Sequence, residues 1–306
     1  MNKISVAMTT YNGENFLKQQ LDSIYSQTLL PDEIIVVDDC STDSTHGILE
    51  EYHKNKGLIY IINDNNLGVN KNFEKAIKYC NGDYIAICDQ DDIWMQTKIE
   101  KSVAKLIEIE NNGLPSLVTS KNIEIDRSGI IINKPLEEGD SIDYYISLFN
   151  HYMQGCSMFM NRKLLDYILP LPDRKEIMYD VFIGLTASMI GNKYNIDEPL
   201  MYHRRHESNV TSSIYKNNNK NLFQLGKYFP FYSHERLNNM LYVEERNSSS
   251  FLTERIKLFN LIKNIAVEKN VIKKINMILT IKELSIWQRT HAVIDTVYNT
   301  MKQTLK

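Results

Sequence analysis

The chain has 306 residues, of which 43% are hydrophobic and 24% are charged. Those proportions are typical of a folded globular protein with a sizeable core, and they exclude an intrinsically disordered chain. The net charge changes sign along the chain, from −10 over residues 1–219 to +7 over residues 220–306. The acidic first part argues against nucleic acid as the ligand, whereas the basic second part could contact an anionic membrane surface or form a solvated helical face.

The four cysteines are scattered and form no C-x-x-C pair, and the N-terminus carries no basic and apolar signal segment. This pattern predicts a protein of the reducing cytoplasm. No hydrophobic run approaches the roughly 18 to 20 residues of a transmembrane helix, so contact with a membrane is expected only at its surface, on the cytoplasmic face.

Short β-rich runs alternate with helical patterns in the first part of the chain. A helical spacing over residues 16–25 separates the first two of these runs. Strands that are apolar on both faces need helices on both sides, so the pattern predicts a doubly wound α/β domain with a mostly parallel sheet. The expected strands are residues 4–8, 33–37, 58–62 and 84–88.

Polar residues follow three of these strands, at 9–12, 38–39 and 89–92. Because ligands of such sheets bind outside the carboxyl ends of the strands, we expect the three clusters to share one rim. The third cluster contains three aspartates. Neighbouring carboxylates repel and raise each other's pKa, which a hard cation such as Mg²⁺ or Mn²⁺ would relieve. A solvated acidic turn is the alternative interpretation.

Further elements can be placed along the chain. Residues 41–44 offer side chains that cap a helix, residues 126–129 form a turn signal that predicts a hairpin or loop, and residues 176–190 return to helical spacing. The three polar clusters that share one rim, at 9–12, 38–39 and 89–92, have the organisation of a binding site.

From about residue 220 the pattern becomes helical and basic, with apolar spacing over residues 251–265 and 272–279. We therefore expect one domain over residues 1–215 and a helical region over residues 216–306, with 217–219 as a linker. This helical region could cover the acceptor, a partner or a membrane, or it could pack against the α/β domain.

Several motifs follow one another over residues 1–212, and together they resemble glycosyltransferase family 2, an inverting family with the GT-A fold. The Asp-Gln-Asp-Asp-Ile-Trp phrase and the His-Arg-Arg-His run are most similar to the rhamnosyltransferase-like subgroup of bacterial polysaccharide biosynthesis. The resemblance implies a GT-A domain with an α-helical C-terminal extension. The motifs are residues 8–14 (MTTYNGE), 36–43 (VVDDCSTD), 66–72 (NLGVNKN), 89–92 (DQDD), 154–159 (QGCSMF), 179–182 (YDVF) and 197–206 (DEPLMYHRRH).

The resemblance implies that Asp180 is the catalytic base, which takes the proton of the acceptor hydroxyl. A helix cap is the alternative role for this carboxylate. A divalent cation, Mn²⁺ or Mg²⁺, would bind Asp91, with His206 as a candidate additional ligand. Asp89 would lie nearer the ribose and a metal-bound water, and Asp92 would orient the carboxylates of this motif.

Positive charge for the leaving diphosphate would come from Arg204 or Arg205 through charge-assisted hydrogen bonds. A pyrimidine nucleotide would be bound by residues at the ends of the strands and at a helix start, together with Asp89. Glu14 is expected either at the ribose or as a charge at a helix N-terminus. The expected nucleotide contacts are Thr9, Tyr11, Glu14, Asp39, Lys71 and Asp89.

The segments around Gly155, Cys156 and Tyr179 would line the donor-sugar and acceptor side. Trp94 would either stack on a sugar face or pack in the core. The chain departs from the family pattern in having Met8 before Thr9, Lys71 in place of an arginine, and Tyr179 before the base. These departures leave the nucleotide and the donor sugar open.

The sequence thus predicts a metal-dependent inverting glycosyltransferase that moves a sugar from a nucleotide-sugar donor to a glycan or lipid-linked glycan of the cell surface. Deoxythymidine diphosphate rhamnose is the first expected donor, followed by a uridine diphosphate hexose or N-acetylhexosamine. The expected partners include no nucleic acid, and a homodimer is compatible with the sequence. The alternative of a different class is a non-catalytic sugar-nucleotide-binding or scaffold protein.

Overall fold

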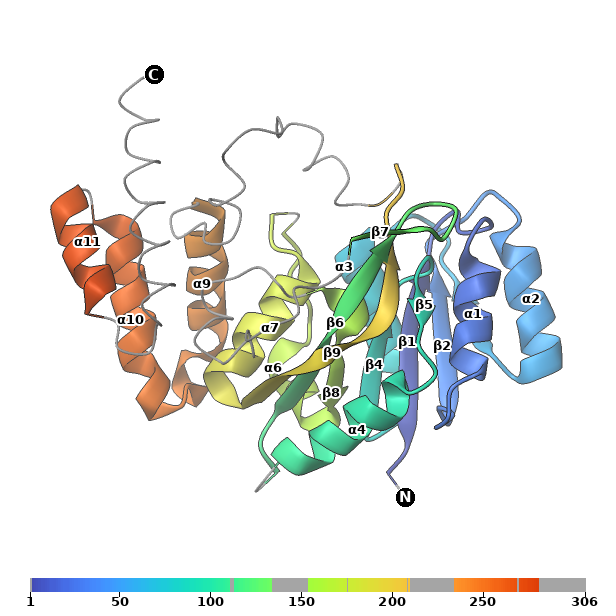
Figure 1. The fold of residues 1–306 in the computed structure, drawn as a ribbon, viewed down its shortest axis with the longest axis horizontal. Coiled ribbons are helices and arrows are strands. Elements are labelled where there is room, and N and C mark those ends of the chain that lie inside the picture. The colour runs from blue at the N-terminus through green and yellow to red at the C-terminus, as the bar shows by residue number, and fades with distance from the viewer. Residues whose placement is uncertain are drawn as a thin grey trace.

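The computed structural model describes residues 2–110, 113–133, 154–174, 176–207, 209, 234–268 and 270–280. Its centre is a mixed sheet with the strand order β3-β2-β1-β4-β8-β6-β9-β5, and β7 pairs with β6 (Figure 1). Helices cover this sheet on both sides. The expectation of a doubly wound α/β domain is confirmed.

Four strands form the parallel half of the sheet. They are β1 (Ile4–Thr10), β2 (Glu33–Asp38), β3 (Ile59–Ile62) and β4 (Tyr84–Cys88). All four expected strands are present, and β1 extends two residues further than its apolar run because Thr9 and Thr10 pair in parallel with Val37 and Asp38. The polar residues after β1, β2 and β4 therefore emerge at one edge.

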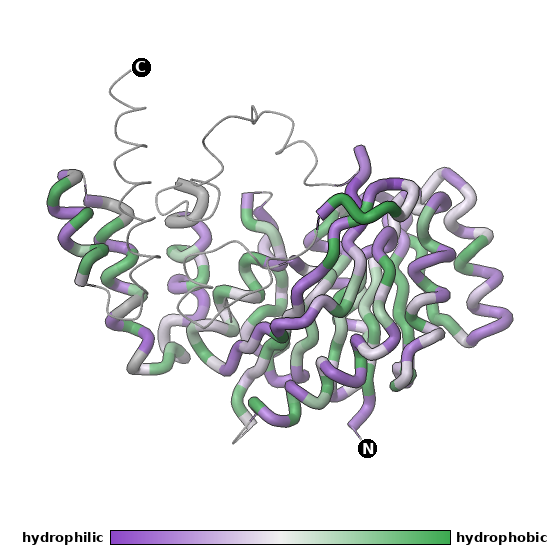
Figure 2. Tube along the Cα trace, viewed as in Figure 1, coloured by the Kyte–Doolittle hydropathy of each residue, from purple (hydrophilic) through white to green (hydrophobic). Residues whose placement is uncertain are grey.

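Alternate residues of the strands face two separate hydrophobic clusters. Val6, Met8 and Val36 pack on the side of α1 (Leu17–Tyr25), α2 (Thr45–Lys56) and α4 (Lys98–Ile109). Ala7 and Ile35 pack on the side of α3 (Val69–Tyr79). In Figure 2 hydrophobic colour runs along the central strands, whereas the covering helices alternate between hydrophobic and hydrophilic residues. This pattern follows from the period-2 geometry of a strand that is buried on both faces.

The second half of the sheet is mixed. It contains β6 (Ser116–Ile125), β7 (Ile131–Asn133), β8 (Phe159–Asn161), β9 (Asn192–Arg204) and β5 (Ile93–Trp94). Strand β8 runs antiparallel to both β4 and β6, and β6 and β7 form the hairpin that the turn signal predicts. Asp126 shapes its turn by accepting hydrogen bonds from the main chain at Ser128 and Ile130.

The helix α7 (Tyr179–Ile190) is apolar on nearly all sides. Its composition follows from its position, because it lies between the sheet and the C-terminal helices α9 (His234–Asn247), α10 (Thr253–Val267) and α11 (Val271–Leu279) (Figure 1). The remaining short elements are α6 (Leu165–Ile168), η2 (Gly155–Ser157), η3 (Arg162–Leu164) and η5 (Ser248–Ser250).

The C-terminal helices share a hydrophobic core with the α/β domain. The Phe182 and Tyr242 rings lie 5.5 Å apart, and the Arg255 guanidinium donates to the carbonyl of Ser188 at 2.6 Å. Met240, Val243, Phe259, Ile262, Ile265 and Ile278 are buried in the same cluster as α7. The linker expected at 217–219 lies outside the described residues. Within the described ranges, no helix has the length and apolar character needed to cross a bilayer.

Candidate active site

The loops after β1 and β4 are joined by one glutamine. Gln90 Oε1 accepts a hydrogen bond from the main-chain N–H of Tyr11 at 2.9 Å, and Gln90 Nε2 donates to the carbonyl of Tyr11 at 3.0 Å. A Cβ atom at Gly13 would lie 2.3 Å from Gln90 Oε1, so any larger residue there would displace the Gln90 side chain. The Tyr11 side chain remains 50% exposed at this rim, where a ligand can reach it.

The aspartate pair after β2 shapes the surrounding loops. Buried Asp38 accepts hydrogen bonds from Thr10 Oγ1 at 2.7 Å and from the main chain of Ser41 at 2.8 Å. Asp39 accepts from the main chain of Leu67 at 2.7 Å and of Gly68 at 2.9 Å. Asp39 is only 4% exposed, and both of its carboxylate oxygens are engaged in organising the loop before α3.

Three carboxylates follow β4 in sequence, as the pattern predicts. Burial, together with the charges of Asp91 and Asp92, raises the pKa of Asp89 well above its ordinary value. Burial would also raise the pKa of Asp92, but the His203 imidazole and the main-chain N–H of Arg204 hold it below the ordinary value. Negative charge is therefore concentrated and incompletely compensated at Asp89.

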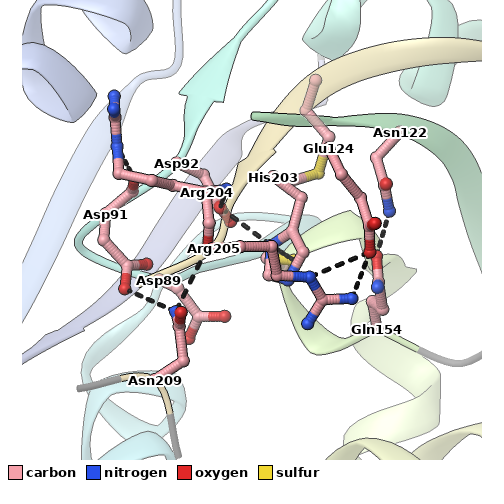
Figure 3. A network of polar contacts seen from close by, with 12 residues as sticks. Asp89, Asp91, Asp92, Asn122, Glu124, Gln154, His203, Arg204, Arg205 and Asn209 are labelled. Atoms are coloured by element: carbon pink, nitrogen blue, oxygen red, sulfur yellow. Dashed lines mark hydrogen bonds and ion pairs between the residues drawn. The ribbon is translucent and has the colours of Figure 1, made fainter. Parts of the chain in front are cut away.

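His203 and Arg204 at the end of β9, and His206 just beyond it, contact these carboxylates, and Figure 3 shows His203 and Arg204 beside Asp92. His203 Nδ1 lies 2.9 Å from Asp92 Oδ1, and the main-chain N–H of Arg204 donates to the same oxygen at 3.0 Å. His206 Nε2 lies 2.7 Å from Asp91 Oδ2. The structure thus brings together the aspartate motif and the His-Arg-Arg-His run, which the sequence places on one site.

The two arginines of this run do not point to a common target. The Arg204 guanidinium is buried and donates to the carbonyls of Asp91 at 2.9 Å and Arg127 at 3.0 Å, and to Gln19 Oε1 at 2.6 Å. Burial lowers its pKa. These contacts make Arg204 a buried residue that joins three segments of the chain. The expectation that Arg204 binds the diphosphate is corrected accordingly. Arg205 Nε donates to Glu124 Oε1 at 2.9 Å and remains partly exposed.

The donor set around Asp91 fits a divalent cation. Asp91 Oδ2 faces His206 Nε2 and, at 3.2 Å, Asn209 Nδ2, while burial and, after it, the charge of Asp91 raise the pKa of the neighbouring Asp89. Carboxylate oxygens and an imidazole nitrogen suit Mn²⁺, and the carboxylates alone suit Mg²⁺. Asp91 and His206 are therefore the residues that would hold the ion.

Asp180 lies in the first turn of α7, at the same rim. Burial raises its pKa to about 6, against hydrogen bonds from the main chain of Val181 and Gly155 that favour the carboxylate. Its charge contributes to the raised pKa of Asp89, which places the two carboxylates in one electrostatic environment. Oδ1 accepts from the N–H of Val181 at 2.7 Å, so the carboxylate makes a capping contact although it lies largely buried at this rim.

The neighbours of Asp180 fix its helix. The N–H of Tyr179 donates to Asn70 Oδ1 at 3.0 Å, which joins the start of α7 to the first turn of α3. The Tyr179 ring is buried, and a Cβ atom at Gly155 would lie 1.9 Å from its hydroxyl oxygen. Gly155 and Tyr179 are therefore in contact, as their assignment to one side of the site implies, and Cys156 is buried behind them.

The remaining expected residues occupy different environments. Thr9 is partly exposed at the end of β1, and Lys71 Nζ lies 3.8 Å from Asp173 Oδ2. Glu14 Oε2 accepts from the main chain of Ser44 at 3.0 Å, which favours its helix-terminal interpretation. Trp94 is 2% exposed and packs with Lys98, whose Nζ lies 5.1 Å from its ring centroid. These contacts place Trp94 in the core and not on a sugar face.

Sequence reasoning missed three residues that build the site. Gln90 bridges two loops, Gln19 accepts from Arg204, and Asn209 donates to Asp91. The position of Gln90 inside the aspartate motif was an available signal. Gln19 lies on a helix and Asn209 beyond the last motif, and both act through partners more than 100 residues away, so no local spacing identifies them.

The model of the family described as Glycosyl transferase family 2 matches residues 5–169. The chain belongs to glycosyltransferase family 2. The dTDP-rhamnosyl transferase RfbG of Shigella flexneri is 30% identical over 221 residues, which cover 66% of this chain and 72% of that protein. The resemblance to the rhamnosyltransferase-like subgroup is thereby confirmed.

Solved structures share the fold of this family 2 protein. TarS of S. aureus, residues 1–349 in complex with UDP-GlcNAc, superimposes with a TM-score of 0.62 at 17% identity, covering 96% of this chain and 79% of that one. The mannosyltransferase PcManGT of Pyrobaculum calidifontis, in complex with GDP-Man and Mn²⁺, has a TM-score of 0.53 at 13% identity, covering 97% and 88%. The fold is GT-A, and the family makes the protein a sugar-nucleotide glycosyltransferase.

Proposed function

We propose that this protein is a metal-dependent, inverting glycosyltransferase that transfers one sugar from a nucleoside-diphosphate donor to a surface glycan or its lipid-linked precursor. The observation that carries the proposal is the Asp180 carboxylate, which stands at the rim beside the Asp89–Asp92 loop with a pKa of about 6. A base must be ionised at the working pH and still accept a proton, and a pKa near 6 satisfies both needs.

Inversion follows from a single displacement. The acceptor hydroxyl attacks the anomeric carbon, its proton passes to Asp180 Oδ, and the bond to the nucleoside diphosphate breaks on the opposite face of the sugar. Asp180 belongs to α7, whereas the metal-binding carboxylate belongs to the loop after β4. Because Asp180 and Asp91 lie on different elements, one can act as the base while the other helps to stabilise the leaving group.

The leaving diphosphate needs positive charge. A cation held by Asp91 and His206 would neutralise the phosphate oxygens, and Asp92 would keep this loop in place through His203. Of the two expected arginines, Arg205 is the better candidate for the diphosphate, because it is partly exposed while Arg204 is buried.

For the nucleotide, we propose contacts from Thr9, from the exposed Tyr11 and from Lys71. Asp39 would act by holding the main chain of Leu67 and Gly68 in place. The similarity to a dTDP-rhamnosyl transferase favours dTDP-rhamnose as donor, and a fold shared with a UDP-GlcNAc complex keeps UDP sugars as the next choice.

The experiment is isothermal titration calorimetry of the protein with dTDP and with UDP, each with and without Mn²⁺, repeated on Asp91→Ala. We expect metal-dependent binding of one nucleotide that is lost in Asp91→Ala. Binding that is indifferent to the metal and to the substitution would contradict the assigned metal site. Binding without transfer from any dTDP or UDP sugar would support the non-catalytic alternative.

We also propose that the basic C-terminal helices contact an anionic membrane surface. Lys257 and Lys273 are exposed on α10 and α11. Replacing both with glutamate in the full chain should reduce binding to vesicles that contain anionic lipid at low salt, because each basic residue contributes about 1 kcal/mol near such a surface. Equal binding of the wild type and the double variant would remove this contact from the proposal.

A further inference from the structure

A second group of potential metal ligands lies behind the aspartate motif. Asp92, Cys156 and His203 each offer a ligand atom, and these three atoms all lie within 4.8 Å of one another. His203 Nδ1 is 2.9 Å from Asp92 Oδ1 and 3.9 Å from Cys156 Sγ. The three residues come from the loop after β4, from η2 and from β9, so the fold itself assembles the cluster.

One atom of this cluster lacks a regular hydrogen bond. Asp92 Oδ2 is buried and has no hydrogen bond of ordinary geometry with a described residue, and Asp92 as a whole is 0% exposed. The Cys156 thiol is the side chain that interacts with the Asp92 carboxylate besides His203 among the described residues. A buried carboxylate oxygen without a partner is costly, because a charged group loses its hydration when it is removed from water. A bound cation would supply the missing interaction. The His203 side chain is 12% exposed and forms the edge of the cluster nearest to solvent.

The donor atoms differ in chemical class from those around Asp91. A thiolate, an imidazole and a carboxylate form a sulfur, nitrogen and oxygen set, which favours Zn²⁺ or Co²⁺ over Mg²⁺. Around Asp91 Oδ2, the described hydrogen-bond partners are nitrogen atoms of His206 and Asn209 and include no sulfur. The adjacent residues Asp91 and Asp92 thus belong to two different sets of potential metal ligands, and only the set around Asp92 includes a soft sulfur ligand among the described residues.

We propose that Asp92, Cys156 and His203 form a binding site for a zinc-class cation, distinct from the site of the catalytic ion. On binding, the Cys156 thiol loses its proton and His203 Nδ1 becomes the unprotonated ring nitrogen, so any proton on these atoms is released to solvent. The bound ion would link η2 and β9 to the loop after β4 through its three ligands. This proposal does not depend on the identity of the donor sugar or of the base.

The probe is Co²⁺, titrated into the reduced, chelator-treated full chain in the presence of excess Mg²⁺. Cobalt bound to a thiolate has a charge-transfer absorption that cobalt bound only to carboxylates lacks. We expect this absorption to saturate at one Co²⁺ per chain and to disappear when Zn²⁺ is added. Substitution of a group that only supports a ligand already costs about 10–100-fold in metal affinity, so Cys156→Ser should weaken Zn²⁺ binding by at least about 100-fold.

Two matched variants test the location. Cys80→Ser removes another buried thiol, which contacts the carbonyl of Ala76 and the Ser5 side chain, and should keep the absorption. Asp91→Asn should lose sugar transfer yet keep the absorption, so failure of the catalytic assignment and failure of this site can be told apart.

The wild type alone can overturn the proposal, because absence of a thiolate–cobalt absorption would mean that no such site exists. Persistence of the absorption in folded Cys156→Ser would place the ion elsewhere. If Cys156→Ser does not fold, His203→Gln provides a second test, because it removes the imidazole ligand and should weaken Zn²⁺ binding. An unchanged Zn²⁺ affinity in folded His203→Gln would overturn the proposal.

Discussion

His206 Nε2 lies 2.7 Å from Asp91 Oδ2, and this contact joins two segments that are 115 residues apart in the chain. The His206 ring also packs against Phe16, with 4.8 Å between the ring centroids. The imidazole is therefore held in one orientation by an aromatic ring and a carboxylate. Such orientation is what a metal ligand needs, because a fixed ligand loses little entropy when the ion binds.

His206→Ala should raise the Mn²⁺ concentration needed for half-maximal transfer by about 10–100-fold, because the variant loses one ligand but retains Asp91. The measurement is initial rate against Mn²⁺ concentration at saturating donor. His53→Ala is the control, since His53 contacts the carbonyl of Leu58 at the C-terminal end of α2. An unchanged metal requirement in His206→Ala would exclude His206 as a ligand.

Asp180→Asn should bind nucleotide normally and lose transfer, because an amide cannot accept the hydroxyl proton. In the wild type, kcat/KM should fall as the pH decreases through about 6, where Asp180 becomes protonated. Asp166→Asn, an exposed carboxylate on α6, is the control. Transfer at the wild-type rate by Asp180→Asn would require another base.

Asp180→Asn should also be more stable to unfolding than the wild type at neutral pH. The raised pKa of Asp180 means that folding penalises its charged form, and the neutral amide removes this penalty. The gain in Tm should be complete above the folded pKa of about 6 and should vanish as the pH falls below the model-peptide value of about 3.9. Thermal unfolding of both proteins across this pH range measures the difference in Tm. A difference that does not depend on pH would show that it does not arise from burial of the charged Asp180 carboxylate.

Gly155→Ala should disrupt the site, because the new Cβ would approach Tyr179 Oη to 1.9 Å and force the start of α7 to move. We expect a lower Tm and a large loss of kcat. Gly47→Ala, on α2 with no atom within 4 Å of the added Cβ, should be stabilised by about 0.5–1 kcal/mol. If Gly155→Ala retained full activity, the contact between η2 and α7 would not position Asp180.

Arg204→Lys should destabilise the protein by about 2 to 4 kcal/mol, because one ammonium cannot reach the four acceptors that the buried guanidinium contacts. Urea unfolding provides the measurement. Arg174→Lys, an exposed arginine that stacks on Tyr242, should change stability far less. Equal destabilisation by Arg204→Lys and Arg174→Lys would mean that the buried contacts of the Arg204 guanidinium contribute nothing particular to stability.

Sequence pattern predicted the elements that depend on local periodicity. The strands that end at Asp38 and Cys88, the hairpin around Asp126 and the helix that carries Asp180 all have signals within a few residues. The rim could also be predicted, because parallel strands must end at a common edge.

The partners of individual polar groups could not be predicted in this way. Arg204 and Arg205 are adjacent and chemically identical, yet one is buried against main-chain carbonyls and the other pairs with Glu124 near the surface. The difference arises from strand alternation in β9 together with the path of a distant hairpin. Trp94 and Lys98 lie in the core for the same reason, since their environment is built by β8 and β9.

The packing of α9–α11 on α7 has a consequence for biosynthesis. A nascent chain emerges from its N-terminus, so the helix that carries Asp180 is made before the residues that cover it. Until Met240, Phe259 and Ile278 have left the ribosome, the apolar side of α7 faces water. A chain interrupted after the segment matched by the family model, residues 5–169, would contain β1–β4 and lack both Asp180 and the helices that cover α7. The burial of α7 is therefore completed late in translation, when most of the chain has been made.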